Sequence, residues 1–249
     1  MEPLKLQNIP LPHRAVFGPM AGFTDAPCRR LMAQHGAGFT VSEMVSSRAL
    51  VYHDHKTVSL LKAQPNGAPY GVQIFGEVPE IMGEATAAME QYEFDFVDIN
   101  MGCPAPKITG NGEGSALMKE PGVAARVIEA VAKAADLPVS VKFRKGWDSG
   151  HVNCVDFARM AEASGAAFVT IHGRTRDQMY SGAADWEVIA EAKAALSIPV
   201  IGNGDVTGGS SAIAMRDYTG CDGIMIARGA LGNPYVFQEV KAAFAGVPY

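Results

Sequence analysis

Short apolar segments of β type alternate with longer segments of helical periodicity along the whole chain. This rhythm is typical of parallel strands that are joined by helical crossovers. The pattern predicts eight strands, which cover residues 15–20, 39–43, 70–75, 96–100, 139–143, 167–172, 199–203 and 223–227. It predicts helices between them at residues 25–34, 79–91, 121–135, 154–163, 186–195 and 210–218.

Several of these helices begin with Asp, Ser or Pro and end at Gly, which is the asymmetry expected of helix caps. Strand–helix units of about 30 residues predict an α/β fold of the (β/α)8 or TIM-barrel type. We expect residues 1–249 to form this barrel as a single domain. An open, doubly wound sheet is the rival architecture.

In such a barrel, function belongs to the carboxyl ends of the strands. Polar or functional side chains stand at nearly every predicted strand exit, whereas the amino ends carry small and apolar residues. The residues at the exits are Met20, Glu43, Gln73, Asn100, Lys142, His172, Asn203 and Arg228. The chemistry is therefore predicted to gather on one rim.

The composition, with 48% hydrophobic and 19% charged residues among 249, allows a substantial core. A net charge of −5 argues against a broad basic face that binds nucleic acid through counterion release. It leaves room for a local basic patch at residues 28–30 or 142–145. With no signal peptide and no apolar run near the ~20 residues of a membrane span, we expect a cytoplasmic protein.

The four cysteines lie far apart and form no Cys-x-x-Cys pair, so we expect free thiols rather than a zinc site or a disulfide framework. His53 and His55 have no third ligand near them in the sequence, and we interpret them as surface residues. No metal site is predicted.

Lys142 lies on the alternation phase opposite Val139 and Val141. If the valines face the helices, Lys142 points into the barrel. Since a buried ammonium is costly without a counter-charge, the pattern indicates an anionic or electron-rich ligand, or else an internal salt bridge with Asp98 or Glu43.

The same alternation carries Phe168, Thr170 and His172 inward. A lone histidine is usually structural, but a position at the rim beside Lys142 favours a functional site.

Glycine-containing turns follow the seventh and eighth strands, at residues 202–205 and 227–229. Barrels commonly hold a ligand phosphate there, and Arg228 adds a fork of donors. Ordinary turn glycines are the alternative. The glycines at 110–114 do not have the spacing or the context of a dinucleotide fingerprint.

Cys103 stands in a Gly-Cys-Pro turn just after a buried strand and close to Asn100. An ordinary thiol is mostly protonated at neutral pH and can donate a proton over a pocket, although inert packing is the commoner role of a cysteine. The glycine-rich segment 101–115 is predicted to be a mobile active-site loop.

Nine segments, in the right order, resemble the bacterial tRNA-dihydrouridine synthases over almost the whole chain. They are GPMAGFTD (18–25), SEMV (42–45), VQIFG (72–76), DINMGCP (98–104), GSALM (114–118), VKFRKGW (141–147), IHGRTR (171–176), IGNGDV (201–206) and MIARGALGNPYVF (225–237).

The resemblance implies an FMN-containing barrel that reduces the C5=C6 bond of uridines in tRNA, with NADPH as the electron donor. By motif position, FMN would be held by Pro19, Met20, Ala21, Gln73, Lys142, His172, Asn203, Gly204, Asp205, Ala227 and Arg228. Cys103 would be the general acid that protonates C5, and Asn100, Arg144 and Arg174 would border the uracil. Lys142 would lie near N1 and O2 of the flavin ring.

The chain departs from the family in two ways. Family members usually continue beyond residue 237 into a helical domain that grips tRNA, so this chain, which ends at Tyr249, is expected to lack that domain and to bind tRNA more weakly. Glu113 replaces a usually small residue and would set a negative charge near RNA phosphates. The alternatives are an FMN barrel that acts on a free pyrimidine and a flavoprotein without turnover. We expect a monomer.

Overall fold

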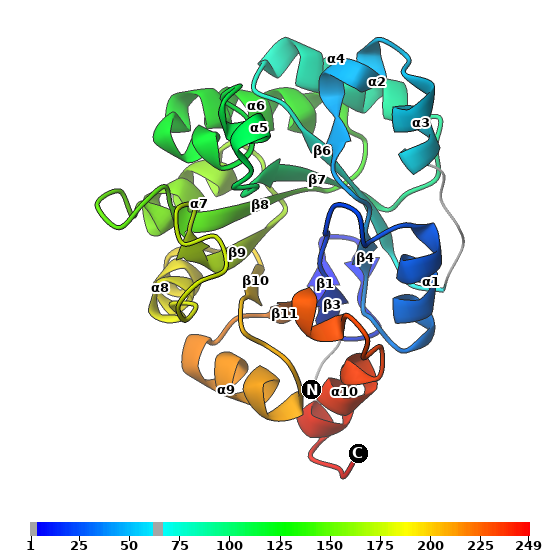
Figure 1. The fold of residues 1–249 in the computed structure, drawn as a ribbon, viewed down its shortest axis with the longest axis vertical. Coiled ribbons are helices and arrows are strands. Elements are labelled where there is room, and N and C mark those ends of the chain that lie inside the picture. Colours follow the sequence, from blue (N-terminus) through cyan, green and yellow to red (C-terminus); the bar gives the residue numbers. More distant parts are fainter. Residues whose placement is uncertain (1–3, 62–66) are drawn as a thin grey trace.

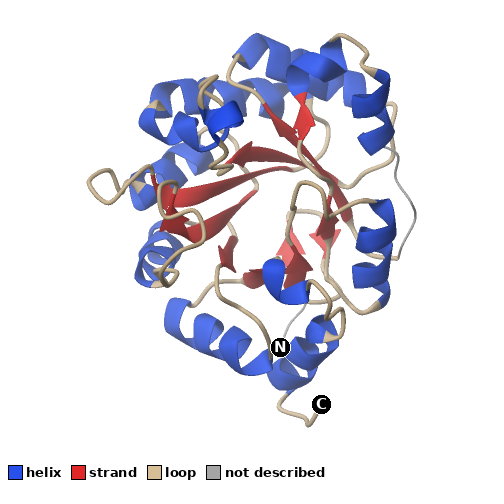
Figure 2. Ribbon diagram, viewed as in Figure 1, coloured by secondary structure: helices blue, strands red, loops and turns tan. Residues whose placement is uncertain are grey.

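A computed structural model describes residues 4–61 and 67–249, and it shows a closed barrel of parallel strands surrounded by helices (Figures 1 and 2). Around the barrel the strands follow the order β4-β3-β11-β10-β9-β8-β7-β6, and pairing of β4 with β6 closes the ring. The strands are β3 (Ala15–Phe17), β4 (Thr40–Val41), β5 (Val45–Ser46), β6 (Tyr70–Phe75), β7 (Phe96–Met101), β8 (Val139–Gly146), β9 (Phe168–Thr175), β10 (Val200–Asn203) and β11 (Gly223–Ile226).

The helices cover the outside of this ring (Figure 2). They are α1 (Ala26–Gln34), α2 (Ser47–Val51), α3 (His55–Leu61), α4 (Pro79–Met89), α5 (Pro106–Thr109), α6 (Pro121–Ala134), α7 (Cys154–Ala163), α8 (Glu187–Ala195), α9 (Gly209–Thr219) and α10 (Val236–Ala245). Two 3₁₀ helices, η1 (Gly114–Lys119) and η2 (Arg228–Ala230), lie in connections. The TIM-barrel prediction is confirmed, and the open-sheet rival is wrong.

Four of the eight predicted strands agree with the structure to within one residue at each end, and the other four differ. The first strand ends at Phe17 rather than residue 20, because the chain turns there and the amides of Phe23 and Thr24 bond back to the Met20 carbonyl. The second is split into β4 and β5, which both pair with β6. Strands β8 and β9 run past their predicted ends to Gly146 and Thr175, which pair with each other beyond a register shift.

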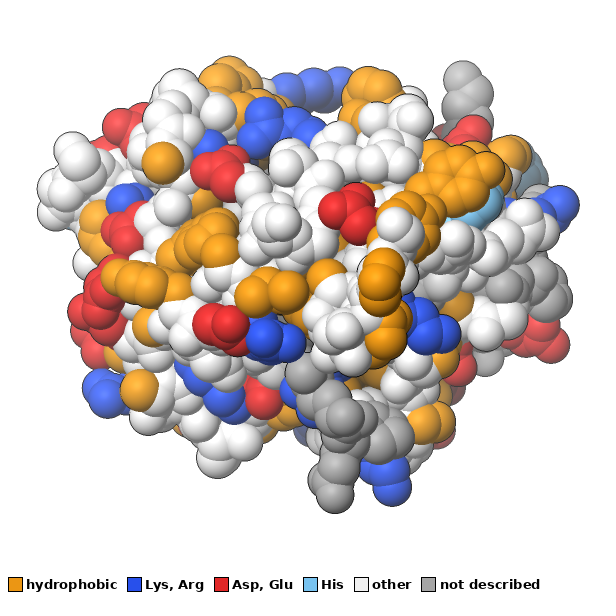
Figure 3. Space-filling model, turned by 90° about the horizontal axis from the view of Figure 1, so that it is seen from below, with side chains coloured by type: hydrophobic (Ala, Val, Ile, Leu, Met, Phe, Trp, Pro, Cys, Tyr) orange, Lys and Arg blue, Asp and Glu red, His pale blue; other side chains and the backbone are white. Residues whose placement is uncertain are grey.

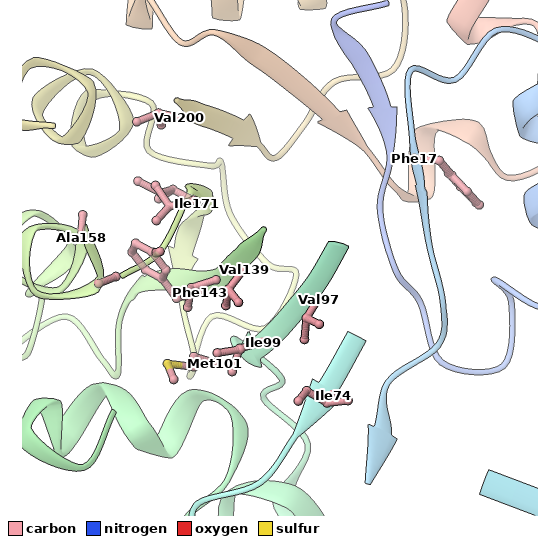
Figure 4. Packing of buried hydrophobic residues seen from close by; sticks show 14 of the residues in the cluster. Phe17, Ile74, Val97, Ile99, Met101, Val139, Phe143, Ala158, Ile171 and Val200 are labelled. Atoms are coloured by element: carbon pink, nitrogen blue, oxygen red, sulfur yellow. The ribbon is translucent and has the colours of Figure 1, made fainter. Parts of the chain in front are cut away.

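The outward faces of the strands pack against the helices and form the larger core. Figure 4 shows part of it, with Phe143, Ile171 and Val200 on the strands and Ala158 on α7. The rings of Phe143 and Phe157 lie 5.1 Å apart. Val139 and Val141 belong to this outer core, so the predicted phase of β8 is confirmed.

A second apolar cluster fills the amino-terminal half of the barrel interior. Phe39, Phe96 and Phe168 meet there with ring centroids 5.1 to 6.1 Å apart. Gly71 makes room for this packing, because a Cβ at that position would lie 2.3 Å from the Phe96 ring.

An antiparallel hairpin of β1 (Lys5–Leu6) and β2 (Ile9–Pro10) covers that end of the barrel, with Leu4 and Leu6 in the same cluster as the three phenylalanines. The sequence interpretation did not include this hairpin. The interior is therefore closed from the amino-terminal side.

Acidic and basic side chains lie interspersed on the face drawn in Figure 3, in keeping with the net charge of −5. Among the described residues, no helix is both long and apolar enough to cross a membrane.

Candidate active site

Polar side chains fill the carboxyl-terminal half of the barrel interior. On β7 and β9 they lie two to six residues beyond Phe96 and Phe168, because inward positions recur every second residue, and the others come from β6, β8 and β10. These buried or half-buried residues are Gln73, Asp98, Asn100, Ser140, Lys142, Arg144, Thr170, His172, Arg174 and Asn203. The structure thus brings together most of the predicted rim residues.

Lys142 reaches across the barrel interior to β10. Its Nζ donates a hydrogen bond of 3.2 Å to Oδ1 of Asn203, whose Nδ2 donates to the carbonyl of Met225. Burial, and then the charge of Arg144, lower the pKa of Lys142 to about 8. Among the described residues, no carboxylate forms an ion pair with Nζ, so the alternative of an internal salt bridge with Asp98 or Glu43 is wrong.

His172 is buried and surrounded by cations. Burial lowers its pKa first, and the charges of Lys142, Arg144, Arg174 and Arg228 add to this effect, bringing the pKa to about 2. The imidazole is therefore neutral at physiological pH. It can accept or donate one hydrogen bond without adding to the positive charge of the site.

Arg144 and Arg174 are buried, and most of their donors hold loops at the rim. Arg144 donates to the carbonyls of Gly102, Thr175 and Met179, which ties the Cys103 turn to the segment after β9. Among the described residues, Nη2 of Arg144 has no hydrogen-bond partner, so this arginine keeps one group for a ligand.

Arg174 has all of its nitrogens committed to protein groups. It donates to the carbonyls of Ser181 and Gly182, lies 3.4 Å from His172 Nε2, and pairs with Asp205 at 2.7 Å. Its geometry is that of a loop anchor, and it is less available to a substrate than Arg144 is.

The turns after β10 and β11 pack closely against neighbouring segments of the chain. At Gly204 φ is +127°, and a Cβ there would lie 2.6 Å from Cβ of Ala184. A Cβ at Gly229 would lie 2.4 Å from the Val206 carbonyl oxygen. Glycine is therefore required at both positions because a side chain would not fit, whereas an ordinary turn would only prefer it. Among the described residues, the amides of Arg228 and Gly229 donate to no other backbone group.

Tyr180 is a rim residue that the sequence interpretation missed. Its ring centroid lies 4.5 Å from Cζ of Arg228 and 5.8 Å from Cζ of Arg144, and the side chain is 55% exposed. It bridges the two arginines at the mouth of the barrel. An aromatic residue in the loop that follows β9 was the only sequence signal for this role.

Cys103 stands at the root of a well-tied segment. Its amide donates to Oδ1 of Asn100 at 2.9 Å, and its carbonyl accepts from both the amide and the hydroxyl of Ser115. The segment expected to be a loop contains α5 and η1. The sequence pattern missed them because both elements are shorter than two helical turns.

Pro19, Met20 and Ala21 lie in the connection after β3, where the amide of Met20 donates to Oγ1 of Thr24. Ala227 follows β11 directly and precedes η2. These residues therefore stand at the carboxyl ends of their strands, and their assignment to FMN stays a prediction.

Glu113 does not present a charge to solvent, which corrects the expectation for that residue. It is 5% exposed and lies against Glu77, which Arg48 holds by an ion pair. Burial, followed by the charge of Glu77, raises the pKa of Glu113 to about 7.

One of the two candidate basic segments, residues 28–30, is likewise internal in part. Arg29 is buried, donates to the Thr24 carbonyl at 2.7 Å, and lies over the Tyr70 ring at 4.7 Å. It is a structural residue rather than part of a nucleic-acid face.

Residues 16–247 match the family described as dihydrouridine synthase (Dus). The chain belongs to this family. It is 43% identical to a "Probable tRNA-dihydrouridine synthase" of Rhodobacter capsulatus, over 98% of this chain and 75% of that protein. It is 40% identical to "tRNA-dihydrouridine synthase B" of Pasteurella multocida, over 96% of this chain and 72% of that protein.

The barrel is also similar to solved structures of low sequence identity. Histamine dehydrogenase from Rhizobium sp. 4-9 superposes with a TM-score of 0.75 at 14% identity, over 96% of this chain and 47% of that one. This likeness concerns the fold alone, and the chain spans about half of that protein.

Proposed function

We propose that this dihydrouridine synthase reduces uridine to 5,6-dihydrouridine in tRNA, with FMN as its cofactor and NADPH as its reductant. The observation that carries the proposal is the placement of family motifs around one cluster of cationic side chains. Lys142, Arg144 and Arg228 lie close enough to His172 at the carboxyl-terminal end of the barrel for their charges to lower its pKa. That charge suits an anionic cofactor and a polyanionic substrate.

The residues present fit FMN on two grounds. The turns at Gly204 and Gly229 leave no room for a side chain, and the amides of Arg228 and Gly229 point to no protein backbone acceptor within the described chain. Glycine turns, unused amides and an arginine side chain after the last two strands are the parts of a phosphate site. We assign the phosphate to this end and the ring system to the interior beside Lys142.

Lys142 supports the reduced cofactor in this proposal. Its low pKa shows that nearby charge and burial already disfavour the ammonium, so an anionic ligand beside Nζ would restore it. Bound FMN supplies the hydride that uracil C6 receives. Pro19, Met20, Ala21, Gln73, Asn203, Asp205 and Ala227 complete the assigned FMN site by motif position.

Cys103 holds the proton that the uracil needs at C5. Its thiol is half-buried at the rim, and the turn that carries it is bound to Arg144 through the Gly102 carbonyl. Arg144 has one nitrogen left for the substrate, which favours it over Arg174 as the group that orients the base. The target base must leave its stack to reach this pocket.

The experiment combines the visible spectrum with turnover. We expect the purified protein to show a flavin spectrum or to gain one on reconstitution with FMN. NADPH oxidation should then depend on unmodified tRNA, and mass spectrometry should find dihydrouridine in the product. Oxidation that free uridine or orotate supports equally well, with no dihydrouridine in tRNA, would contradict the proposal.

A further inference from the structure

Four side chains and two backbone amides form an unbroken line of hydrogen bonds beneath the cationic cluster. Ser140 Oγ donates to Asp98 Oδ1 at 2.5 Å, and Gln73 Nε2 donates to Asp98 Oδ2 at 2.6 Å. Asn100 Nδ2 donates to Gln73 Oε1 at 2.8 Å. Oδ1 of Asn100 accepts from the amides of Cys103, at 2.9 Å, and Gly102, at 3.1 Å.

The sheet register places these groups side by side. Gln73 on β6 is paired with Asp98 on β7, and Asp98 is paired with Ser140 on β8. Asp98 is 3% exposed, Gln73 is 1% exposed and Ser140 is fully buried. Water therefore cannot replace a missing partner in this layer at low cost, and each buried amide group must find its bond within the protein.

The direction of the line is fixed at both ends. An ionised carboxylate only accepts, so the Gln73 amide must turn its nitrogen toward Asp98 and its oxygen toward Asn100. A backbone amide only donates, so Asn100 must turn its oxygen toward Cys103. The reversed line would place Asn100 Nδ2 against two N–H groups. Asp98 and the Cys103 turn thus require the same orientation of both amides.

We propose that Asp98 is a positioning residue for the proton donor: through Gln73 and Asn100 it fixes the Cys103 turn over the pocket. This assignment rests on the proposed function for its catalytic meaning. It gives Asn100 a role in holding Cys103, because both polar atoms of its side chain are used by the protein.

Asp98→Leu tests the anchor, since leucine fills the space and cannot accept a hydrogen bond. Asp98→Asn is the matched control. Its oxygen can accept from Gln73, and its nitrogen can donate to Ser140 Oγ, whose own proton already has the Val97 carbonyl within 3.4 Å. The asparagine variant therefore keeps the direction of the line while it removes the charge.

In single-turnover experiments on FMN-loaded protein, we expect Asp98→Leu to slow uridine reduction by on the order of 100-fold, the cost of a small misplacement of a reacting group. Flavin reduction by NADPH should slow far less than uridine reduction, although Asp98 also orients Gln73 of the assigned FMN site. Asp98→Asn should restore uridine reduction to within about threefold of the wild type, since its hydrogen bonds remain. If both variants are equally slow, the charge matters rather than the anchor, and the proposal is overturned.

A second readout does not depend on activity. We expect iodoacetamide to alkylate Cys103 several times faster in Asp98→Leu than in the wild type or in Asp98→Asn, because the turn is released. Cys28, on α1, is an internal reference whose rate should not change. Equal Cys103 rates in all three proteins would overturn the proposal, and so would loss of FMN from Asp98→Leu.

The two readouts separate the proposals. A wild type that forms no dihydrouridine would end the proposed function, whereas the alkylation rates would still decide whether Asp98 holds the turn. If Asp98→Leu does not fold, Asp98→Ala removes the same acceptor without any contact against Gln73, and the same rates are measured on it.

Discussion

The two halves of the barrel interior differ completely in chemistry although the same strands build them. The amino-terminal half holds Phe39, Phe96 and Phe168 in ring-to-ring contact. The carboxyl-terminal half holds Asp98 and His172, only two and four residues further along β7 and β9. A single inward phase therefore supplies packing at one end and ionisable groups at the other.

The difference shows where stability and function are separated. The phenylalanines need no partner but one another and the hairpin, and their burial stabilises the ring. In the carboxyl-terminal half, which we call the upper half, burial disfavours the charged forms of the ionisable groups. It raises the pKa of Asp98 and lowers the pKa of Lys142. The amino-terminal half is called the lower half. The unfavourable burial of these ionisable groups is tolerated because the lower half stabilises the same strands.

The largest expected effect belongs to the upper half alone. Cys103→Ala should slow dihydrouridine formation roughly 100- to 10,000-fold, the usual range for loss of a general acid. Flavin reduction by NADPH and the melting temperature should stay as in the wild type, because the thiol fills no core. Rapid-mixing measurements of the two half-reactions check this, and equal turnover in the variant would remove Cys103 from the mechanism.

Truncation of a side chain in the lower, amino-terminal half should reduce stability and leave FMN binding intact. Phe96→Ala removes a ring from the centre of the lower cluster and is expected to cost about 3–5 kcal/mol of unfolding free energy. The folded fraction should still bind FMN at low temperature. Urea titration gives the loss, and Phe96→Leu, which leaves a smaller cavity, is the control. A loss of FMN without a loss of stability would contradict the separation of the two halves.

Asp98 allows a test of the strain in the upper half. Burial raises the pKa of Asp98 to about 6, so the folded protein binds a proton more tightly than the unfolded chain does. Its contribution to stability is therefore lost as the pH rises from about 4 to 6 and stays lost above that range. Asp98→Asn should be more stable than the wild type by about 2 kcal/mol at pH 7.5.

At pH 4 that advantage should vanish, because the carboxyl is then protonated in the folded state. Urea titrations of both proteins at the two pH values measure the difference. A stabilisation that is equal at both values would indicate altered packing rather than relief of a buried charge.

The smallest expected effect concerns Lys142. Its pKa is lowered from 10.5 to about 8, so the folded state releases its proton more readily than the unfolded chain. The cost of the buried ammonium is present below pH 8 and is relieved as the pH rises from 8 toward 10.5. In FMN-free protein, loss of this proton should raise the free energy of unfolding by about 1 kcal/mol over roughly the first pH unit above 8. Lys142→Met should lack this component of the stability–pH curve, and an identical curve would contradict the assignment.

The sequence predicted the barrel because a two-residue strand period and a helical period survive in almost every unit. It also predicted that Lys142 points inward, since Val139 and Val141, at the alternate positions of the same strand, face the helices. The hairpin at Lys5–Pro10 was missed, although Leu4 and Leu6 alternate before a turn at Gln7, where φ is +53°. Each strand of the hairpin has two residues, which is too short for a hydrophobic alternation to be recognised in the sequence.

The contacts of individual side chains were harder to predict than the strands on which the side chains lie. Arg174 stays a predicted neighbour of the uracil, but its nitrogens bind Asp205, 31 residues away along the chain, and two carbonyls of the loop after β9. Glu113 was expected in solvent and is buried against Glu77. Neither arrangement leaves a local pattern in the sequence, because both depend on how separate βα loops meet at the rim.

The hairpin under the barrel has a kinetic consequence. With Leu4, Leu6 and three phenyl rings filling one end, the described part of the barrel leaves the opposite end as the route into the interior. Under the proposed function, NADPH and the flipped base would then use the same opening, one after the other. Turnover should follow double-displacement kinetics, in which each substrate leaves before the next one enters and competes with it at high concentration.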